Sequence, residues 1–200
     1  MPVTVNYQSE AKPLEMSWAF WLRWLAVTLG GFLASLFWIE IGERPDIGLI
    51  EGMLGGATIG FAQSLVLRRH FSPAWWWGLA NMLSWGLIGF SIFGATGWIA
   101  PRSLNLALRL FYGIINGAQI GFVLGVGQWL VLRLQVPNAW RWIAASTLCW
   151  SIGLAVGWIV GGILRLVTHL FLGEVVGLAV AWIVVGATTG LALIFLVDFS

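Results

Sequence analysis

Long stretches without a charged residue constrain this chain more than any other feature. Residues 25–39 and 175–197 carry no charge, and apolar side chains dominate both stretches without alternating with polar ones. The whole chain is 60% hydrophobic and 9% charged, whereas soluble domains carry about 25% charged residues. Lipid is therefore the expected solvent. Because unalternating runs do not fit the strands of a membrane barrel, the sequence predicts an all-α integral membrane protein.

Breaks that carry proline or charge divide the chain into six predicted transmembrane helices, since a span needs about 20 apolar residues. Proline marks the first four breaks, and the fifth, near residues 165–169, has none. Residues 1–16 are polar and are predicted to form a short cytoplasmic tail ahead of a single transmembrane domain at 17–200. The predicted helices cover residues 18–39, 47–67, 75–98, 104–132, 140–164 and 171–197.

The basic residues orient these helices. Positive charge concentrates in the cytoplasmic loops of membrane proteins, and indole rings settle at the level of the lipid headgroups. Six of the ten Lys and Arg residues fall on the side of the two termini, so we expect both termini in the cytoplasm. Tryptophan clusters begin the first, third and fifth helices on the same side. The residues predicted to anchor the chain at this interface are Trp75, Trp77, Trp140, Trp142, Arg68 and Arg133.

The fourth predicted helix is long for a bilayer. As a helix, residues 104–133 would measure about 45 Å, against a hydrocarbon core of about 30 Å. The polar residues near its start, Arg102, Asn105 and Arg109, favour a first segment that lies at the membrane interface.

The chain also resembles itself at a fixed spacing. Residues 60–85 and 125–150 are identical at 12 of 26 positions when they are offset by 65 residues. A second pattern occurs three times, as GATIG, GAQIG and GATTG. An even number of helices per unit keeps every copy in the same orientation. We therefore expect three parallel helix pairs, at about 17–70, 71–135 and 136–200.

Glycine recurs every four residues in three of the predicted helices. This spacing places the glycines on one helix face, where the missing side chains let another backbone approach closely. Packing within the chain is the simpler interpretation, and a contact face for a partner protein or a flat ligand is the alternative. The ten positions are Gly52, Gly56, Gly60, Gly113, Gly117, Gly121, Gly125, Gly153, Gly157 and Gly161.

Polar residues inside the predicted spans are candidate ligand contacts, because such residues are costly in lipid. Gln63 and Gln128 occupy matched positions of the repeat, and hydrogen bonds between helices are the simpler explanation for both. Thr58, Gln119 and Thr188 share another repeat position and are expected to converge near a central axis. The candidates for ligand contact are Gln63, Gln128, Gln119, Asn81, Asn116 and Glu51.

No catalytic signature accompanies these residues. The chain has no G-x-S-x-G, no GxxxxGK[ST] and no HExxH pattern, and few titratable groups fall within the predicted spans. A single cysteine, Cys149, gives neither a disulfide framework nor a cysteine-based metal site. The net charge of +2 is too small to indicate nucleic acid. We therefore expect a protein that is not an enzyme, with no metal site and no nucleic-acid partner.

The string GQWLVLR, followed by AWRW and a helix rich in glycine and tryptophan, resembles a group of uncharacterised cyanobacterial membrane proteins. Those proteins look like multiples of a G-x-x-Q-W-L-V-L-R unit that a short loop joins to a Trp-rich helix. The resemblance covers residues 56–150, and Ser64 stands where the pattern has tryptophan. It implies a thylakoid or plasma membrane, and it implies no function.

Three functions stay open. The leading one is a non-catalytic accessory or assembly subunit of a larger membrane complex, which the glycine faces and the tryptophan clusters favour. The alternative is a small-molecule-binding component of a membrane transporter, similar in size and topology to the substrate-binding subunits of energy-coupling vitamin transporters. A polar pocket on the Glu51 side would favour that alternative.

The third function is pigment binding in a thylakoid, with Gln63, Gln128, Asn81 and Asn116 as ligands for chlorophyll magnesium. No cofactor is predicted, although chlorophyll or another lipid-like ligand stays open. The expected partners are membrane lipids and other membrane proteins.

Overall fold

The computed structural model describes residues 18–43, 47–92 and 94–198, and these residues form helices and connecting loops with no strand. The predicted tail at 1–16 and the loop residues Arg44 and Asp46 lie outside the described residues. The helices are α1 (Trp18–Ser35), α2 (Leu49–Leu67), α3 (Trp75–Phe90), the short 3-10 helix η1 (Thr96–Trp98), α4 (Leu106–Leu132), α5 (Arg141–Thr168) and α6 (Leu172–Asp198).

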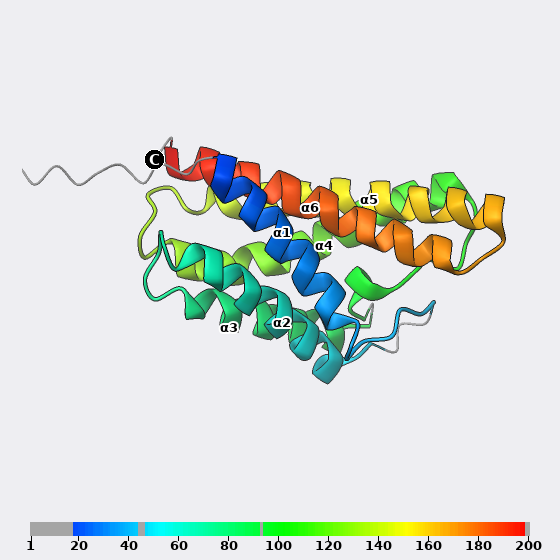
Figure 1. The fold of residues 1–200 in the computed structure, drawn as a ribbon, viewed down its shortest axis with the longest axis horizontal. Helices are drawn as coiled ribbons and strands as arrows, with labels where there is room; N and C mark the ends of the chain where they lie inside the picture. The colour runs from blue at the N-terminus through cyan, green and yellow to red at the C-terminus, as the bar shows by residue number, and fades with distance from the viewer. Residues whose placement is uncertain (1–17, 44–46, 93, 199–200) are drawn as a thin grey trace, which may run out of the picture.

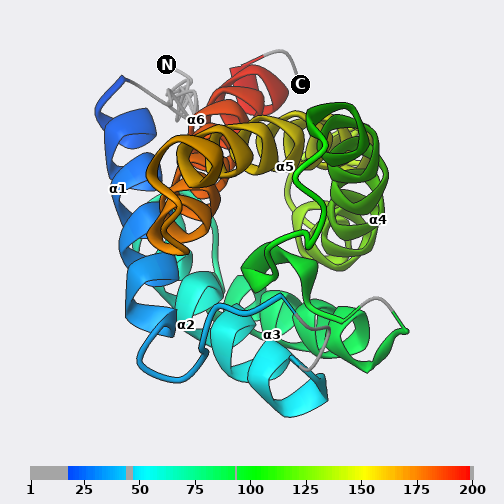
Figure 2. The ribbon, with the colours of Figure 1, turned by 90° about the vertical axis from the view of Figure 1, so that its right-hand side faces the viewer.

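The six α-helices form a closed ring. Each helix packs against the next one in the chain, and α6 packs against α1 to close the circle (Figure 2). Seen from the side, α1 begins and α6 ends at the same end of the bundle (Figure 1). We call this the terminal end, and we call the opposite end the far end.

Among the described residues, four helices are long and apolar enough to cross a membrane: α2, α4, α5 and α6. Helices α4, α5 and α6 contain 27, 28 and 27 residues, which at 1.5 Å per residue corresponds to about 40 Å each. At the far end, α5 and α6 extend well beyond α1 and α2 (Figure 1). Helix α5 stops at Thr168 because His169 adopts a left-handed φ of 57°, which ends a helix.

The third predicted span, residues 75–98, is wrong in its last third. Helix α3 ends at Phe90, and residues 94–100 return into the bundle as a loop in which every residue is buried. This loop lies inside the ring (Figure 2). The N–H of Ala95 donates to the carbonyl of Ile47 over 3.2 Å, and that of Ala100 to the carbonyl of Gly42 over 2.9 Å. A buried loop needs such partners, and here the connection between α1 and α2 provides them.

Tryptophan rings fill the centre of the ring of helices. Trp98 from the buried loop contacts Trp85 of α3, with ring centroids 4.5 Å apart, and its indole N–H donates to Ser35 Oγ over 2.8 Å. Trp182 of α6 lies 4.9 Å from Trp150 of α5. Each such ring buries on the order of 150–250 Å². The loop therefore returns inward because the Trp98 ring and its N–H both find partners there.

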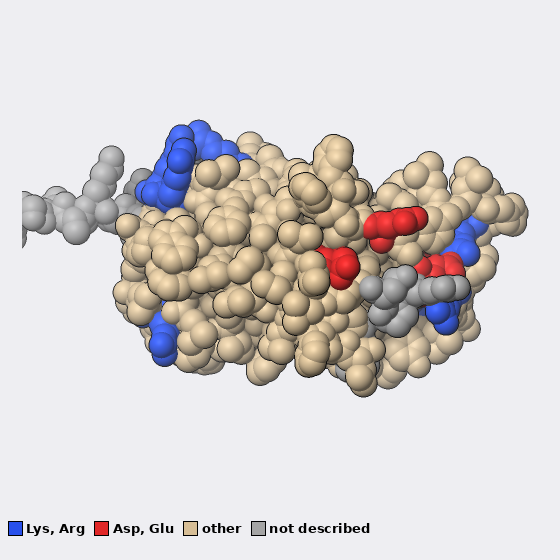
Figure 3. Space-filling model, turned by 90° about the horizontal axis from the view of Figure 1, so that it is seen from below, with Lys and Arg blue, Asp and Glu red and all other residues tan. Residues whose placement is uncertain are grey.

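Charge is segregated along the bundle. On the face shown in Figure 3, the Lys and Arg atoms lie at the two ends of the long axis, and the surface between them is free of basic atoms. Of the four acids whose side chains are described, Glu40 and Glu43 lie in the α1–α2 connection, Glu51 in the first turn of α2 and Glu174 in the first turn of α6. These segments lie at the far end (Figure 1).

Candidate functional site: a charged pocket over a buried ion pair

Arg109 lies one turn into α4 at the far end, and its side chain is completely buried. The position follows from the start of the helix, because Asn105 Oδ1 accepts hydrogen bonds from the N–H groups of Ala107 and Leu108 over 2.9 and 3.2 Å. An asparagine cap of this kind fixes where a helix begins. The residues expected to form an interfacial first segment belong to one unbroken helix, and this helix carries Arg109 into the protein interior.

The Arg109 guanidinium uses all five of its N–H donors. Nη1 and Nη2 bind the two carboxylate oxygens of Glu174 over 2.8 and 2.5 Å. The remaining donors reach the carbonyl oxygens of Ser103, Trp158 and Pro101. Glu174, in the first turn of α6, is 2% exposed. A paired, fully hydrogen-bonded arginine is the form in which such a charge is tolerated inside a protein.

A second set of charges lies above this pair, closer to the surface. Arg165 of α5 binds the Glu43 carboxylate and also approaches Glu174 Oε1 at 3.5 Å. Arg102 Nε donates to the backbone carbonyl of Glu43 over 3.1 Å. The connection between α1 and α2 is thus tied to both α5 and the start of α4 through Glu43.

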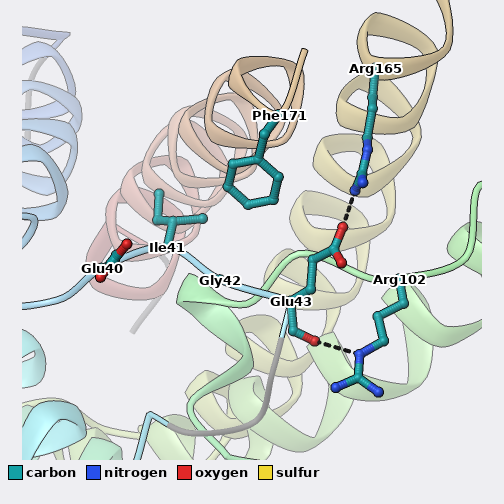
Figure 4. A pocket seen from close by; sticks show the side chains of 7 residues that line it. All are labelled: Glu40, Ile41, Gly42, Glu43, Arg102, Arg165 and Phe171. Atoms are coloured by element: carbon teal, nitrogen blue, oxygen red, sulfur yellow. Dashed lines mark hydrogen bonds and ion pairs between the residues drawn. The ribbon is translucent and has the colours of Figure 1, made fainter. Parts of the chain in front are cut away.

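Glu43, Arg102 and Arg165 line a pocket of about 710 Å³ (Figure 4). Arg165 and Glu43 point toward each other across the opening, and Arg102 lies on the other side of Glu43. Glu40 is exposed. The pocket therefore presents both a carboxylate and guanidinium groups, which suits a ligand or peptide segment that carries both signs of charge. Its lining residues are Glu40, Ile41, Gly42, Glu43, Arg102, Arg165 and Phe171.

The structure places Gln63 and Gln128 deep inside the bundle, near its terminal end. Gln63 Oε1 accepts the indole N–H of Trp77 over 2.9 Å, and its amide donates to Thr28 Oγ1 over 3.0 Å. Gln128 Oε1 accepts from Trp142 over 2.8 Å, and its amide donates to the side chain of Asn81 over 3.2 Å. Both glutamines therefore link neighbouring helices.

Trp77 and Trp142 were expected to anchor the chain at the headgroup level, and the structure contradicts this role. Each ring is 1% exposed and lies in the core, because its N–H bonds to a buried glutamine. Trp75 and Trp140, which are 51% and 60% exposed, do face outward at the terminal end. Arg68 and Arg133 are exposed there as well.

The other polar candidates do not meet. Gln119 is exposed, and Asn116 donates to the carbonyl of Tyr112 on its own helix. Thr58 and Thr188 likewise bond to the backbone of their own helices, so the expected convergence of Thr58, Gln119 and Thr188 is wrong. Glu51 Oε2 accepts the N–H of Gly48 and so caps α2. The bonds of Thr58, Asn116 and Glu51 stay within one helix and its cap, and Gln119 is exposed, so these residues build no shared site.

The ten glycines lie against neighbouring helices of the same chain. A Cβ atom added at Gly117 would come within 2.3 Å of the Trp150 carbonyl oxygen, and one at Gly157 within 2.5 Å of that of Gly177. At all ten positions the nearest atom of another helix would be 2.3–3.0 Å away. These faces are occupied within the chain, so they are not available to a partner protein.

Sequence reasoning missed the buried ion pair beside the pocket, Arg109 and Glu174. Arg109 was read as a charge near an interface, and Glu174 drew no attention. One signal was present, because the two residues are 65 positions apart, which is the length of the repeat. Two opposite charges at one repeat position of two apolar helices indicate a buried pair.

Comparison of the chain with protein-family models, with curated proteins and with solved structures found no match. The described residues also contain no group of three His, Cys, Asp or Glu side chains that could hold a metal ion.

Proposed function

We propose that this chain is an integral membrane protein whose six helices are three copies of one helix pair. Large apolar side chains on the outside of the bundle support insertion, among them Leu65, Leu87 and Leu148, which are 57%, 61% and 63% exposed. Water-soluble monomers rarely expose apolar surface so widely. The matched bonds from tryptophan to glutamine support the repeat, because both pairs are separated by 14 residues.

The terminal end is proposed to face the cytoplasm, since exposed arginines gather there. The resemblance to cyanobacterial repeat proteins supports a thylakoid or plasma membrane.

Within the membrane, the proposed role is that of a non-catalytic accessory or assembly subunit. The observation that carries this proposal is the filled interior: Gln63, Gln128 and Asn81 bond to side chains or backbone of the bundle itself, and tryptophan rings occupy its centre. A bundle with a filled interior has no open path for a solute. Its outer surface and its polar far end are the parts that a partner can contact. The mixed charges of the far-end pocket are the proposed contact for a polar segment of a partner.

Affinity purification from native membranes in a mild detergent, followed by mass spectrometry, tests this role. The charge reversal Arg102→Glu is expected to reduce the yield of co-purifying membrane proteins, because Arg102 is exposed at the pocket. Arg133→Glu, an exposed arginine at the opposite end, is the matched control and should retain them. A wild-type protein that purifies only as a free monomer would remove the proposal.

A specific observation also favours the second candidate, a solute-binding membrane protein. The pocket of about 710 Å³ opens at the far end, where Glu51 caps α2, and it carries charges of both signs. Mass spectrometry of small molecules released from the purified protein tests this candidate. A zwitterionic solute present in the wild type and lost in Arg102→Glu would favour it over the assembly role.

The pigment-binding candidate has less support. Three of its four proposed magnesium ligands already use their side-chain oxygen as an acceptor: Gln63 from Trp77, Gln128 from Trp142 and Asn81 from Gln128. A colourless purified protein is the expected result.

A further inference from the structure

Three grooves open on the outside of the bundle at its terminal end, each between two helices that follow each other in the chain. The first lies between α1 and α2, measures about 310 Å³ and is lined by apolar residues that include Phe20, Val27 and Leu65. Arg23 of α1 and Arg69 at the end of α2 both line it. Two guanidinium groups from different helices therefore border one apolar groove.

The other two grooves are also lined mainly by apolar residues, and each contains one arginine. The groove between α3 and α4 measures about 430 Å³ and joins Leu83 and Leu130 to Arg133. The groove between α5 and α6 measures about 420 Å³ and joins Ala145 and Leu196 to Arg141. Each groove combines an apolar wall along the helices with a positive charge near the helix ends.

The charges at these grooves are not neutralised by any described acid. The ion pairs of the described residues involve only Arg109 and Arg165, both of which belong to the far end. Arginine binds phosphate oxygens through charge-assisted hydrogen bonds, and basic pockets beside membrane helices attract anionic headgroups. A ligand with a negatively charged phosphate and an apolar chain fits each groove, because the phosphate can bind the arginine and the chain can pack on the apolar residues.

We propose that the three grooves bind anionic phospholipids, with one acyl chain along the apolar wall and the phosphate at the arginine. The α1–α2 groove binds most strongly, because two arginines, Arg23 and Arg69, line it and each of the other grooves has one. The proposal rests on the insertion of the chain in a membrane. It adds three sites at defined positions, each for a lipid with a negatively charged headgroup.

Native mass spectrometry of the detergent-purified chain tests the sites with phosphatidylglycerol as the probe and phosphatidylcholine as the neutral comparison. We expect the wild type to retain phosphatidylglycerol in preference. The double variant Arg23→Gln/Arg69→Gln should bind it at least tenfold more weakly, since each hydrogen bond to a charged group is worth about a tenfold change in affinity. The double Lys variant at the same positions should keep much of the binding, because it keeps the charge.

Arg68→Gln is the matched control and should bind as the wild type does, because Arg68 is exposed beside Arg69 but lines none of the three grooves. Equal retention of the two lipids by the wild type, or equal weakening in the control and the Arg23/Arg69 variant, would overturn the proposal. Competition by inorganic phosphate alone, with no requirement for the acyl chains, would overturn it too.

The failure of the lipid sites can be told apart from the failure of membrane insertion. Carbonate extraction reports insertion independently, because inserted proteins stay in the membrane pellet. If the chain stays in the pellet but shows no headgroup preference, membrane insertion is supported and the proposed lipid sites are contradicted. A chain that is extracted by carbonate removes both.

Discussion

The indole N–H of Trp77 donates a hydrogen bond of 2.9 Å to Oε1 of Gln63, and both residues are buried. The same bond joins Trp142 to Gln128 at the same separation of 14 residues. The two glutamines also donate to residues that lie four positions after a core tryptophan, Thr28 and Asn81. The buried hydrogen bonds between helices therefore recur at the 65-residue spacing of the sequence repeat.

Gln128→Leu should lower the free energy of unfolding by about 1–3 kcal/mol, because it leaves the Trp142 N–H buried without an acceptor. Gln119→Leu, on the same helix but exposed, should have almost no effect. Thermal unfolding in detergent, followed by tryptophan fluorescence, measures both. Equal midpoints for the two variants would show that the buried bond contributes little.

Leu193→Gln should be far better tolerated than a buried leucine-to-glutamine change normally is. Leu193 lies 65 residues after Gln128, where the repeat would place a third glutamine, and it is 0% exposed. Ser146 Oγ, four residues after Trp142, is buried and has no hydrogen-bond partner in the described part of the chain. A glutamine at 193 would donate a hydrogen bond to that hydroxyl. This bond would offset the cost of burying the amide, which is about 1–3 kcal/mol.

Leu178→Gln is the matched control for this change, because Leu178 is also on α6 and is 1% exposed. The same unfolding measurement compares the two variants. If both lose stability equally, position 193 is not a third member of the glutamine series.

Glu174→Gln should destabilise the protein by about 3–5 kcal/mol, since it leaves the buried Arg109 charge without its counter-ion. Glu40→Gln changes an exposed carboxylate that lines the neighbouring pocket and should cost little stability. The double change Arg109→Met/Glu174→Leu removes both charges and should recover much of the loss. Chemical unfolding of the three variants is the measurement, and a double variant no better than Glu174→Gln contradicts the argument.

Two glycine-to-alanine changes should act in opposite directions. Gly117→Ala places a methyl group within 2.3 Å of the Trp150 carbonyl oxygen, so α4 and α5 must separate and stability must fall. Gly30→Ala meets no atom within 4 Å and should raise stability by about 0.5–1 kcal/mol, because alanine favours the helix. Melting temperatures of the two variants decide the point, and a gain in both would contradict the tight α4–α5 contact.

Helix positions were the most predictable part of the fold. The apolar runs and the proline breaks place α1, α2, α4, α5 and α6 within a few residues of their observed bounds. Residues 94–98 escaped prediction because they continue the apolar run of α3. What bends them back is the Ser35 acceptor for Trp98, which comes from another part of the chain.

The candidate site was less predictable for a related reason. Charges near the end of an apolar run are ordinarily solvated, and nothing local to Arg109 indicates that Glu174 will cover it. Only the spacing of the repeat relates the two residues. The same limit applies to Trp77 and Trp142, since an indole near a helix end suits a lipid headgroup and a buried glutamine equally well.

The contact between α1 and α6 has a consequence for how the protein is made. Trp24 of the first helix donates its N–H to Thr189 of the last one over 3.0 Å. During synthesis one flank of α1 therefore stays uncovered until α6 has been made. A chain truncated before α6 would leave that flank of α1 exposed, so α6 is the helix that closes the ring.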